Sequence, residues 1–434
     1  MNYDFMTMNF SNSIRHLERA KRVIPLASQT FSKCYTQFSV GGTPLFIERA
    51  KGGHAWDLDG NEFVDTLMAL APVNLGYAND EVDAAVFEQM KKGVVFSLPS
   101  KLEAELAEKI CSLIPGAEMV RFGKNGSDAT SGAVRAARAF TGRDRIVCSG
   151  YHGWQDWYIG TTLRHKGVPE ATKRLTHSFK YNDSASLEAL FSEYPNQIAA
   201  VILEPIGVEH PRDNFLSKVK EVAHKNGALL IFDEMITGFR IALGGAQAHF
   251  GVVADLACFG KAIANGYPIS AVTGRREIMK EFEEIFFSFT FGGELASMAA
   301  SLKTIAILER EPVIEHLRRH GQRWQEGYNA LAQELGLEGR TSAVGYGAHH
   351  VISFITAAGE PDLTMRTIYE ETMAENGVLT LGSHNVCYAH TAADTEKILT
   401  AFRAALSRIK EGITSGNLEA LIKGTRVESV FRKP

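Results

Sequence analysis

The run that decides the fold is ALLIFD, residues 228–233, in which five apolar residues end in an acid. Similar short apolar runs recur through the middle of the chain: EMVRF at 118–122, RIVC at 145–148, AAVIL at 199–203 and LACF at 256–259. Stretches with helical spacing separate them, such as 129–140, which places small apolar residues on one face. Strands that alternate with helices predict an α/β fold with a mainly parallel sheet covered on both sides.

A lysine follows the last of these runs. Lys261 lies in FGKAIANGYP, residues 259–268, and comes 28 positions after Asp233. A lysine in a small turn after one buried strand, with an acid that ends another, suits pyridoxal phosphate. The amine forms an imine with the aldehyde, and the carboxylate keeps the pyridine nitrogen protonated. Taken singly, a lysine beside glycine is more often a surface turn, and an acid at a strand end more often caps a helix.

A glycine-containing turn offers a place for the phosphate. The segment FGKNGSDAT, residues 122–130, leaves a strand and enters the small-residue helix. Gly126 permits close backbone approach, Ser127 adds a hydroxyl, and a helix start presents free N–H groups to a dianion. The alternative is a plain strand-to-helix turn with Ser127 as the N-cap. Thr290, beside the glycine pair at 292–293, is a second hydroxyl, for which an ordinary loop position is the alternative.

Two further segments follow predicted strands. Tyr151 and His152 lie in GYHGW, residues 150–154, and Glu204 comes directly after the run at 199–203. An aromatic ring at the edge of a sheet can stack on a flat cofactor, although packing into the core is its commoner role. Ligand crevices of open parallel sheets lie at the carboxyl ends of the strands. We therefore expect these side chains on one rim with Asp233 and Lys261.

Length and composition allow a large globular enzyme. A chain of 434 residues is longer than a single hydrophobic core usually supports, so we expect more than one domain. We expect a large domain at 69–309, a small domain at 310–434, and an N-terminal segment, 1–68, that joins the small domain. A net charge of −4 gives no reason to expect a nucleic acid partner, and no apolar run approaches the roughly 20 residues of a membrane span. The five scattered cysteines lack metal-ligand spacing, which favours no metal site and a reducing cytoplasm.

Five motifs together resemble the class III aminotransferase family, and within it the glutamate-1-semialdehyde aminomutase branch. They are NGSDAT at 125–130, YHG at 151–153, DEMITGFR at 233–240, GK at 260–261 and TFGG at 290–293. The similarity extends from about Leu17 to Leu406 and includes GTPLFIERAKG at 42–52 and FTGRD at 140–144. The resemblance implies a fold-type I pyridoxal-phosphate enzyme with a mainly parallel seven-stranded sheet in the large domain. It also implies a small α+β domain and a homodimer with active sites at the subunit interface.

The resemblance implies a role for each site residue. Lys261 would be the Schiff-base lysine and Asp233 the partner of the pyridine nitrogen. Gly126 and Ser127 would bind the phosphate.

The remaining cofactor positions follow from the same comparison. Tyr151 would stack on one ring face, and Ile236 stands where the family packs an aliphatic residue against the other. Thr290 would reach the phosphate of the neighbouring subunit's cofactor. His152 and Glu204 complete the predicted cofactor site.

The substrate side departs from the aminomutase pattern. That branch carries an arginine for the substrate carboxylate in a Ser-Pro-Val-Arg run, where this chain reads SQTFSK, residues 28–33. Many class III transaminases have a second arginine near the C-terminus, where this chain reads LGSHNVCY, residues 381–388. Arginine binds carboxylates bidentately, and lysine does so only as a point charge. Lys33 or His384 could substitute, and a solvated surface role is open for each; Glu209, in the place of a switching glutamate, lacks an evident arginine partner.

These observations predict amino transfer from a small-molecule donor to a keto or aldehyde acceptor, with Lys261 as the general base. The missing arginines favour an acceptor other than a simple α-keto acid, such as a sugar-like or other polar carbonyl compound. One alternative is glutamate-1-semialdehyde 2,1-aminomutase activity, which moves the amino group within one molecule. A further alternative is a non-catalytic protein that binds pyridoxal phosphate, against which the intact Lys261 and Asp233 argue.

Overall fold

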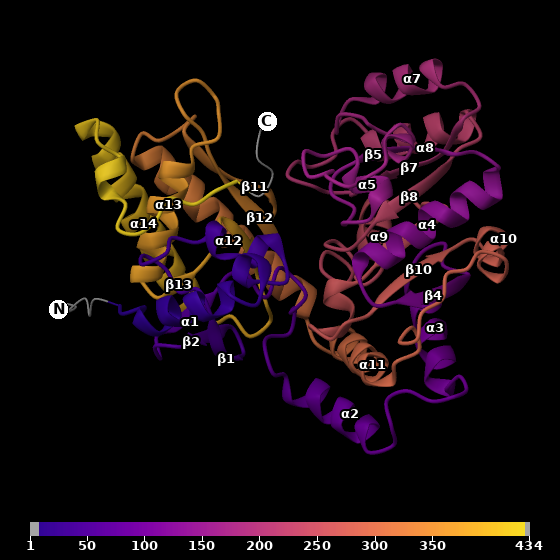
Figure 1. The fold of residues 1–434 in the computed structure, drawn as a ribbon, viewed down its shortest axis with the longest axis horizontal. Helices are drawn as coiled ribbons and strands as arrows, with labels where there is room; N and C mark the ends of the chain where they lie inside the picture. Colours follow the sequence, from indigo (N-terminus) through magenta and orange to yellow (C-terminus); the bar gives the residue numbers. More distant parts are fainter. Residues whose placement is uncertain (1–7, 430–434) are drawn as a thin grey trace. The chain divides into compact units, whose positions relative to one another are not determined.

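The structure, a computed structural model, describes residues 8–429, which form two compact units (Figure 1). The terminal unit comprises residues 8–70, 75–79 and 316–429, and the central unit comprises residues 71–74 and 80–315. The expected domain bounds at 68/69 and 309/310 stay a prediction. Within residues 8–429, no helix combines the length and the apolar composition needed to cross a membrane.

The central unit is built on a seven-stranded sheet with the strand order β4-β10-β9-β8-β7-β5-β6. Its strands are β4 (Met119–Gly123), β5 (Arg145–Ser149), β6 (Thr176–Ser178), β7 (Ile198–Leu203), β8 (Leu229–Asp233), β9 (Leu256–Phe259) and β10 (Ser270–Gly274). The pairs from β9 to β6 are parallel, and β10 runs antiparallel to both β9 and β4. The predicted mainly parallel sheet is confirmed, although the sequence pattern did not indicate β6 and β10.

Helices cover both faces of this sheet, as the sequence predicts. On one face, α4 (Gly126–Thr141) packs on the sheet, including β8, and its small side chains allow a close approach. Ala133 of α4 and Ile231 of β8 belong to the same cluster of buried side chains. Side chains alternate along a strand, so Leu230 and Phe232 face the other side, where they are also buried. There α8 (Phe215–Lys225) packs on β7 and β8. Because both faces are buried, the β8 strand is apolar throughout until it ends in Asp233.

The other helices of the central unit surround this sheet. They are α2 (Asp80–Met90), α3 (Lys101–Leu113), α5 (Asp156–Ile159), α6 (Glu170–Lys173), α7 (Ser184–Glu193), α9 (Gly245–Phe250), α10 (Arg276–Met279) and α11 (Leu295–Arg310). Helix α2 lies along α11, as Figure 1 shows, and α11 also packs on the short 3-10 helix Lys261–Ala264. The segment that carries Lys261 is therefore supported from behind by a long helix.

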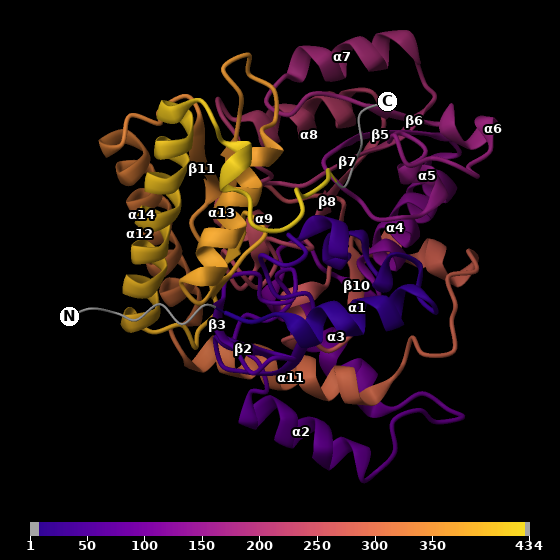
Figure 2. The same cartoon turned by 60° about the vertical axis from the view of Figure 1, so that its left-hand side comes forward.

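The terminal unit combines two small sheets with long helices. One sheet contains β1 (Ile47–Lys51), β2 (His54–Asp57), β3 (Glu62–Asp65) and β13 (Val378–Leu379), and the other β11 (Thr341–Tyr346), β12 (His349–Phe354) and β14 (Ser383–Asn385). Its helices are α1 (Ser11–Lys21), α12 (Val313–Glu334) from residue 316 on, α13 (Leu363–Glu375) and α14 (Ala392–Ser415), and α13 packs against α14 (Figure 2). The parallel pairing of β3 with β13 ties the N-terminal segment to the C-terminal one.

The core of the terminal unit contains a chain of hydrogen-bonded rings. His384 Nδ1 lies 3.0 Å from His350 Nε2, His350 Nδ1 lies 3.0 Å from the carbonyl oxygen of Gly347, and His384 Nε2 lies 2.9 Å from the hydroxyl of Tyr369. Both histidines are fully buried. Burial lowers the pKa of His350 to about 4 and that of His384 well below its ordinary value. The solvated surface role considered for His384 is therefore wrong, because its ring is sealed inside the core and engaged at both nitrogens.

Candidate active site

Four neighbouring strands of the central sheet deliver chemically active side chains at one edge. Asp233 is the last residue of β8, Glu204 follows β7, and Lys261 lies two positions after β9. Tyr151 and His152 come just after β5. Since β9, β8, β7 and β5 are adjacent and parallel, their carboxyl ends place these residues in a row.

A cavity of about 430 Å³ lies at this edge, within the central unit. That volume is in the range of a small-molecule or cofactor site. Eight of the predicted site residues line it: Gly126, Ser127, Tyr151, His152, Glu204, Asp233, Ile236 and Lys261. Thr290 does not line it and lies exposed in the loop before α11. Other residues also line the cavity, among them Pro72, Lys124 and Met235. Lys124 and Met235 lie inside motifs quoted above, but the motifs assign them no role, and no local pattern indicated Pro72.

The start of α4 forms one end of the cavity. The carbonyl of Asn125 accepts hydrogen bonds from the N–H groups of Asp128 and Ala129 at 3.0 and 3.4 Å. The N–H groups of Gly126 and Ser127 have no acceptor within the part of the chain that the structure describes. These two groups, together with the positive end of the helix dipole, form a site suited to an anion.

The glycines at 150 and 153 let a tight turn approach this helix start. Both have φ of +106°, a conformation that residues with a Cβ rarely adopt. A Cβ on Gly153 would lie 2.9 Å from Ser127 Cβ, and a Cβ on Gly150 would lie 2.8 Å from Glu204 Oε2. Ser127 Oγ in turn accepts a hydrogen bond from the N–H of Trp154 at 3.2 Å, which leaves the serine O–H free to donate.

A buried histidine orients Asp233. His152 Nδ1 lies 2.8 Å from Asp233 Oδ2, and His152 Nε2 lies 3.2 Å from the carbonyl oxygen of Ser149. Asp233 Oδ1 accepts the N–H of Met235 at 3.1 Å. Both oxygens of Asp233 are thus held, which fixes the direction of its carboxylate at the cavity wall.

The acid next to Asp233 has a structural role. Glu234 is fully buried and accepts hydrogen bonds from the N–H groups of Ala246 and Gln247, at 2.7 and 3.0 Å, and from the hydroxyl of Thr237 at 2.6 Å. It therefore caps the first turn of α9 and does not line the cavity. Burial raises the pKa of Glu234 to about 7, despite these hydrogen bonds.

Lys261 lies in a strained backbone position at the cavity wall. Its φ is +43°, in the left-handed region that is uncommon for residues other than glycine. Burial lowers the pKa of Lys261 below the ordinary value of lysine, and the negative charges of Glu204 and Asp233 oppose that shift. A lowered pKa increases the share of free amine, which is the form that attacks a carbonyl carbon.

Two residues considered from the sequence for substrate recognition, Lys33 and Glu209, are not among the residues that line this cavity. Lys33 is exposed at the end of a short 3-10 helix of the terminal unit. Glu209 does have an arginine partner, Arg212, whose Nη2 lies 2.7 Å from Glu209 Oε2. Both side chains are more than half exposed, so the pair contributes little to stability. Arg212 belongs to no motif, so the sequence alone did not indicate this pairing.

The sequence model of the class III aminotransferases matches residues 35–406. The chain belongs to the class III aminotransferase family. A 3-aminobutyryl-CoA aminotransferase of Cloacimonas acidaminovorans is 35% identical over 93% of this chain and 99% of its own. A glutamate-1-semialdehyde 2,1-aminomutase of Methanothrix thermoacetophila is 41% identical over 78% of this chain and 81% of its own.

A solved structure agrees with this assignment. The FumI protein of Sphingopyxis sp. MTA144, whose structure contains PLP, has a TM-score of 0.86 and 31% identity, and the similarity covers 93% of this chain and 98% of that one. The class III aminotransferase described here therefore has the fold-type I architecture, and its cofactor is pyridoxal phosphate. The predicted family, fold class, enzyme class and cofactor are confirmed.

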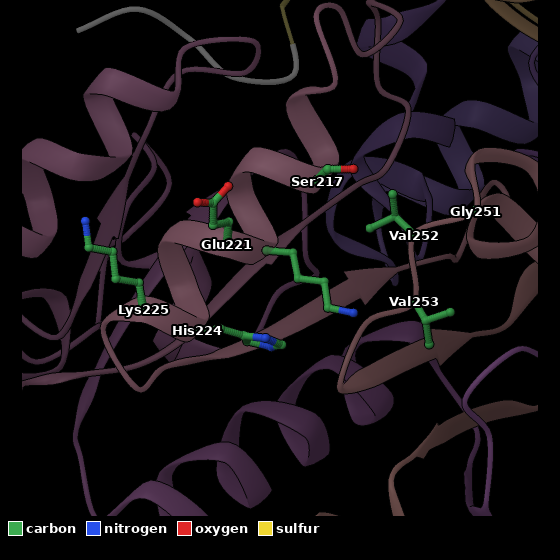
Figure 3. A pocket seen from close by; sticks show the side chains of 8 residues that line it. Ser217, Glu221, His224, Lys225, Gly251, Val252 and Val253 are labelled. Atoms are coloured by element: carbon green, nitrogen blue, oxygen red, sulfur yellow. The ribbon is translucent and has the colours of Figure 1, made fainter.

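A second hollow, of about 570 Å³, lies on the outside of the central unit (Figure 3). It is bordered by side chains of α8, including Glu221 and His224, and by the segment Gly251–Val253 after α9. Figure 3 shows these side chains spread along the two segments without converging on one point. His224 Nε2 is paired with Asp255 at 2.8 Å. The described residues that line this open hollow include one acid, Glu221, whereas the cavity at the sheet edge combines Lys261 with two acids.

Proposed function

We propose that this class III enzyme transfers an amino group from an amino donor to a keto or aldehyde acceptor. The observation that carries the proposal is the meeting of Lys261, Asp233 and the start of α4 in one cavity within the central unit. Each of the three offers what one part of pyridoxal phosphate needs: an amine for the aldehyde, an acid for the ring nitrogen, and an anion site for the phosphate.

The phosphate fits the start of α4. The N–H groups of Gly126 and Ser127 lack acceptors in the described chain, and the hydroxyl of Ser127 is free to donate. A Cβ on Gly126 would approach Met235 Sδ to 3.0 Å, so a glycine at this position keeps the backbone accessible. We assign phosphate binding to Gly126 and Ser127.

The ring fits the middle of the cavity. Tyr151 offers an aromatic surface and Ile236 an aliphatic one, and both line the cavity with Asp233. We assign the two ring faces to Tyr151 and Ile236, and the ring nitrogen to Asp233. His152 would hold Asp233 in its orientation, since their side chains are joined by a 2.8 Å contact.

Proton transfer is the task of Lys261. The bound cofactor supplies an electron sink for the substrate carbon that loses its proton. Lys261 would hold the aldehyde carbon of the cofactor and, once its amine is free, would take the proton from that substrate carbon and return it elsewhere. Asp233, with both oxygens held, would keep the ring nitrogen protonated throughout.

The cavity supports an acceptor other than a simple α-keto acid, such as a sugar-like or other polar carbonyl compound. Among the described residues that line it there is no arginine. Its second cation, Lys124, is paired with Glu294 at 2.9 Å. The related 3-aminobutyryl-CoA aminotransferase is named for a substrate whose carboxyl group is joined to coenzyme A, which agrees with a site that does not grip a free carboxylate.

Aminomutase activity is the second candidate, favoured by the 41% identity to a glutamate-1-semialdehyde 2,1-aminomutase. An amino-aldehyde supplied without a co-substrate separates the two: an aminomutase converts it, and a transaminase does not. A non-catalytic binding protein would do neither, and amino donors would not bleach its yellow colour.

Covalent labelling tests the proposal directly. Borohydride reduction of the yellow protein, followed by peptide mapping, should place the cofactor adduct on Lys261. Lys261→Ala should lose turnover with every donor, because the one other lysine among the described residues that line the cavity, Lys124, is paired with Glu294. The matched control is Lys101→Ala, which removes a surface lysine that is 87% exposed and should keep full activity. An adduct on another residue, or full turnover in Lys261→Ala, would overturn the proposal.

Exposed apolar side chains support a homodimer with active sites at its interface. Two segments of the central unit carry them: Phe87, Met90, Val95, Phe96 and Leu98 in and after α2, and Phe286, Phe289 and Phe291 before α11. The N–H of Leu295 donates to the carbonyl of Val94 at 2.8 Å, so the two segments meet. Thr290 lies within the second segment, as a residue that reaches a partner's cofactor would require.

We also propose a reducing cytoplasm as the location. The five cysteines are all free thiols, and four of them are buried. Burial raises the pKa of Cys148 to about 11 and that of Cys258 well above its ordinary value, which keeps both as unreactive thiols.

A further inference from the structure

Glu204 is an acid of the cavity to which amino transfer as described above assigns no chemical step. It follows β7 directly, one strand away from Asp233, which ends β8. Its carboxyl accepts a hydrogen bond from the N–H of Tyr151. Glu204 therefore has acceptor capacity left and shares the cavity with Lys261.

The other groups near Lys261 are less able to exchange a proton with it. Both oxygens of Asp233 are engaged, by His152 and by the N–H of Met235. Burial raises the pKa values of the phenols of Tyr151 and Tyr158, so neither ionises near neutral pH. Glu204 is the remaining acid at the wall.

Six titratable groups of the described chain interact electrostatically with Glu204. These groups are Asp233, His152, Lys261, Tyr151, Tyr158 and Tyr181. Burial, followed by the negative charge of Asp233, raises the pKa of Glu204 to about 7, and the positive charges of His152 and Lys261 act against this. The negative charge of Glu204 in turn raises the pKa of Lys261, and its effect is larger than that of Asp233.

We propose that Glu204 sets the charge state of Lys261 by exchanging a proton with it across the cavity. An N–H bond of the Lys261 ammonium breaks, a water molecule in the cavity carries the proton, and an O–H bond forms on the Glu204 carboxylate. The charged lysine and the charged carboxylate become a neutral amine and a neutral acid, with no change in electrons or total charge. Glu204 acts through Lys261, and the inference rests on the proposed function, in which the free amine of Lys261 is the reactive form.

This arrangement explains how the buried Lys261 can exist both as an ammonium and as a free amine. While Glu204 is ionised, it stabilises the ammonium that forms when Lys261 takes a proton from substrate. Once Glu204 accepts that proton, the lysine becomes a free amine again in a cavity that disfavours its charge. The hydrogen bond to Tyr151 N–H keeps the carboxyl in place in both states.

The test measures the charge of Lys261 in the cofactor-free, full-length protein. An amine-selective reagent such as trinitrobenzenesulfonate is applied across a pH series, and the labelling of Lys261 is quantified by peptide mass spectrometry. In Glu204→Gln the labelling midpoint should move to lower pH by about one unit, as expected when a nearby opposite charge is removed. The amide oxygen of glutamine can still accept the N–H of Tyr151, so the turn is retained.

Two variants control the measurement. Glu209→Gln removes an acid five positions away that is 58% exposed and paired with Arg212, and it should leave the midpoint unchanged. Glu204→Asp keeps the charge and should keep the midpoint close to that of the original protein. An unchanged or higher midpoint in Glu204→Gln would overturn the inference.

A reciprocal measurement covers the case in which Glu204→Gln does not fold. Removing the cation with Lys261→Met should raise the pH at which the infrared band of a protonated buried carboxyl disappears, because the coupling acts equally on both partners. A band that does not move, with the fold intact, also overturns the inference. Borohydride labelling of the unchanged protein distinguishes this failure from that of the proposed function: an adduct on Lys261 with an unshifted midpoint refutes only the role of Glu204.

Discussion

Replacing Gly153 by alanine tests how the turn after β5 supports the anion site. The backbone at Gly153 has φ of +106°, so an alanine there costs about 1–3 kcal/mol of stability through strain alone. The new Cβ would also lie 2.9 Å from Ser127 Cβ and 3.1 Å from Ser127 Cα, so the helix start must shift. Loss of a hydrogen bond from Ser127 to a charged phosphate is worth about 1.5–3 kcal/mol. We therefore expect pyridoxal phosphate to bind about 10- to 100-fold more weakly.

Gly167→Ala provides the matched control. Gly167 has φ of +92°, and a Cβ there would meet nothing within 4 Å. Both variants should therefore lose stability in urea unfolding by a similar amount, while only Gly153→Ala should lose cofactor affinity. The affinity is measured by titrating the cofactor-free protein and following absorbance. If Gly153→Ala binds the cofactor as tightly as Gly167→Ala, the contact with Ser127 does not shape the phosphate site.

Two further predictions concern the terminal unit and the proposed dimer. Burial holds the pKa of His350 at about 4, against an ordinary value of 6.5. The free energy that the neutral, buried His350 ring contributes to stability is therefore present above pH 6.5 and is lost as the pH falls towards 4. His350→Gln removes that titration. The difference in the free energy of unfolding between the original protein and the variant, measured in urea, should therefore narrow by about 2 kcal/mol from pH 7 to pH 5. A difference that stays constant would contradict a neutral buried ring. If Thr290 reaches the phosphate of a partner's cofactor, Thr290→Val should weaken pyridoxal phosphate binding about 10-fold while sedimentation still shows a dimer, and Ser288→Ala in the same loop should not.

The sequence by itself determined the fold class and the cofactor, because both can be predicted from short segments of the chain. The alternation of apolar runs with helical stretches was enough to predict the parallel sheet and its two covered faces, because a strand that is buried on both faces is apolar along its own length. The position of Lys261 after one strand and of Asp233 at the end of another indicated the cofactor, since the rim of such a sheet follows from strand direction alone. The structure brings eight of the nine predicted site positions to one cavity, where their roles stay proposals.

Only the tertiary structure decided the contacts that join distant residues. Nothing near His384 in the sequence shows that it bonds to His350, 34 positions away, inside an aromatic core. The engagement of His152 with Asp233, 81 positions later, follows from the order of β5, β7 and β8 in the sheet. Periodicity reports whether a side chain is buried, whereas the partner of a buried polar group depends on how separate segments pack, which a single sequence does not state.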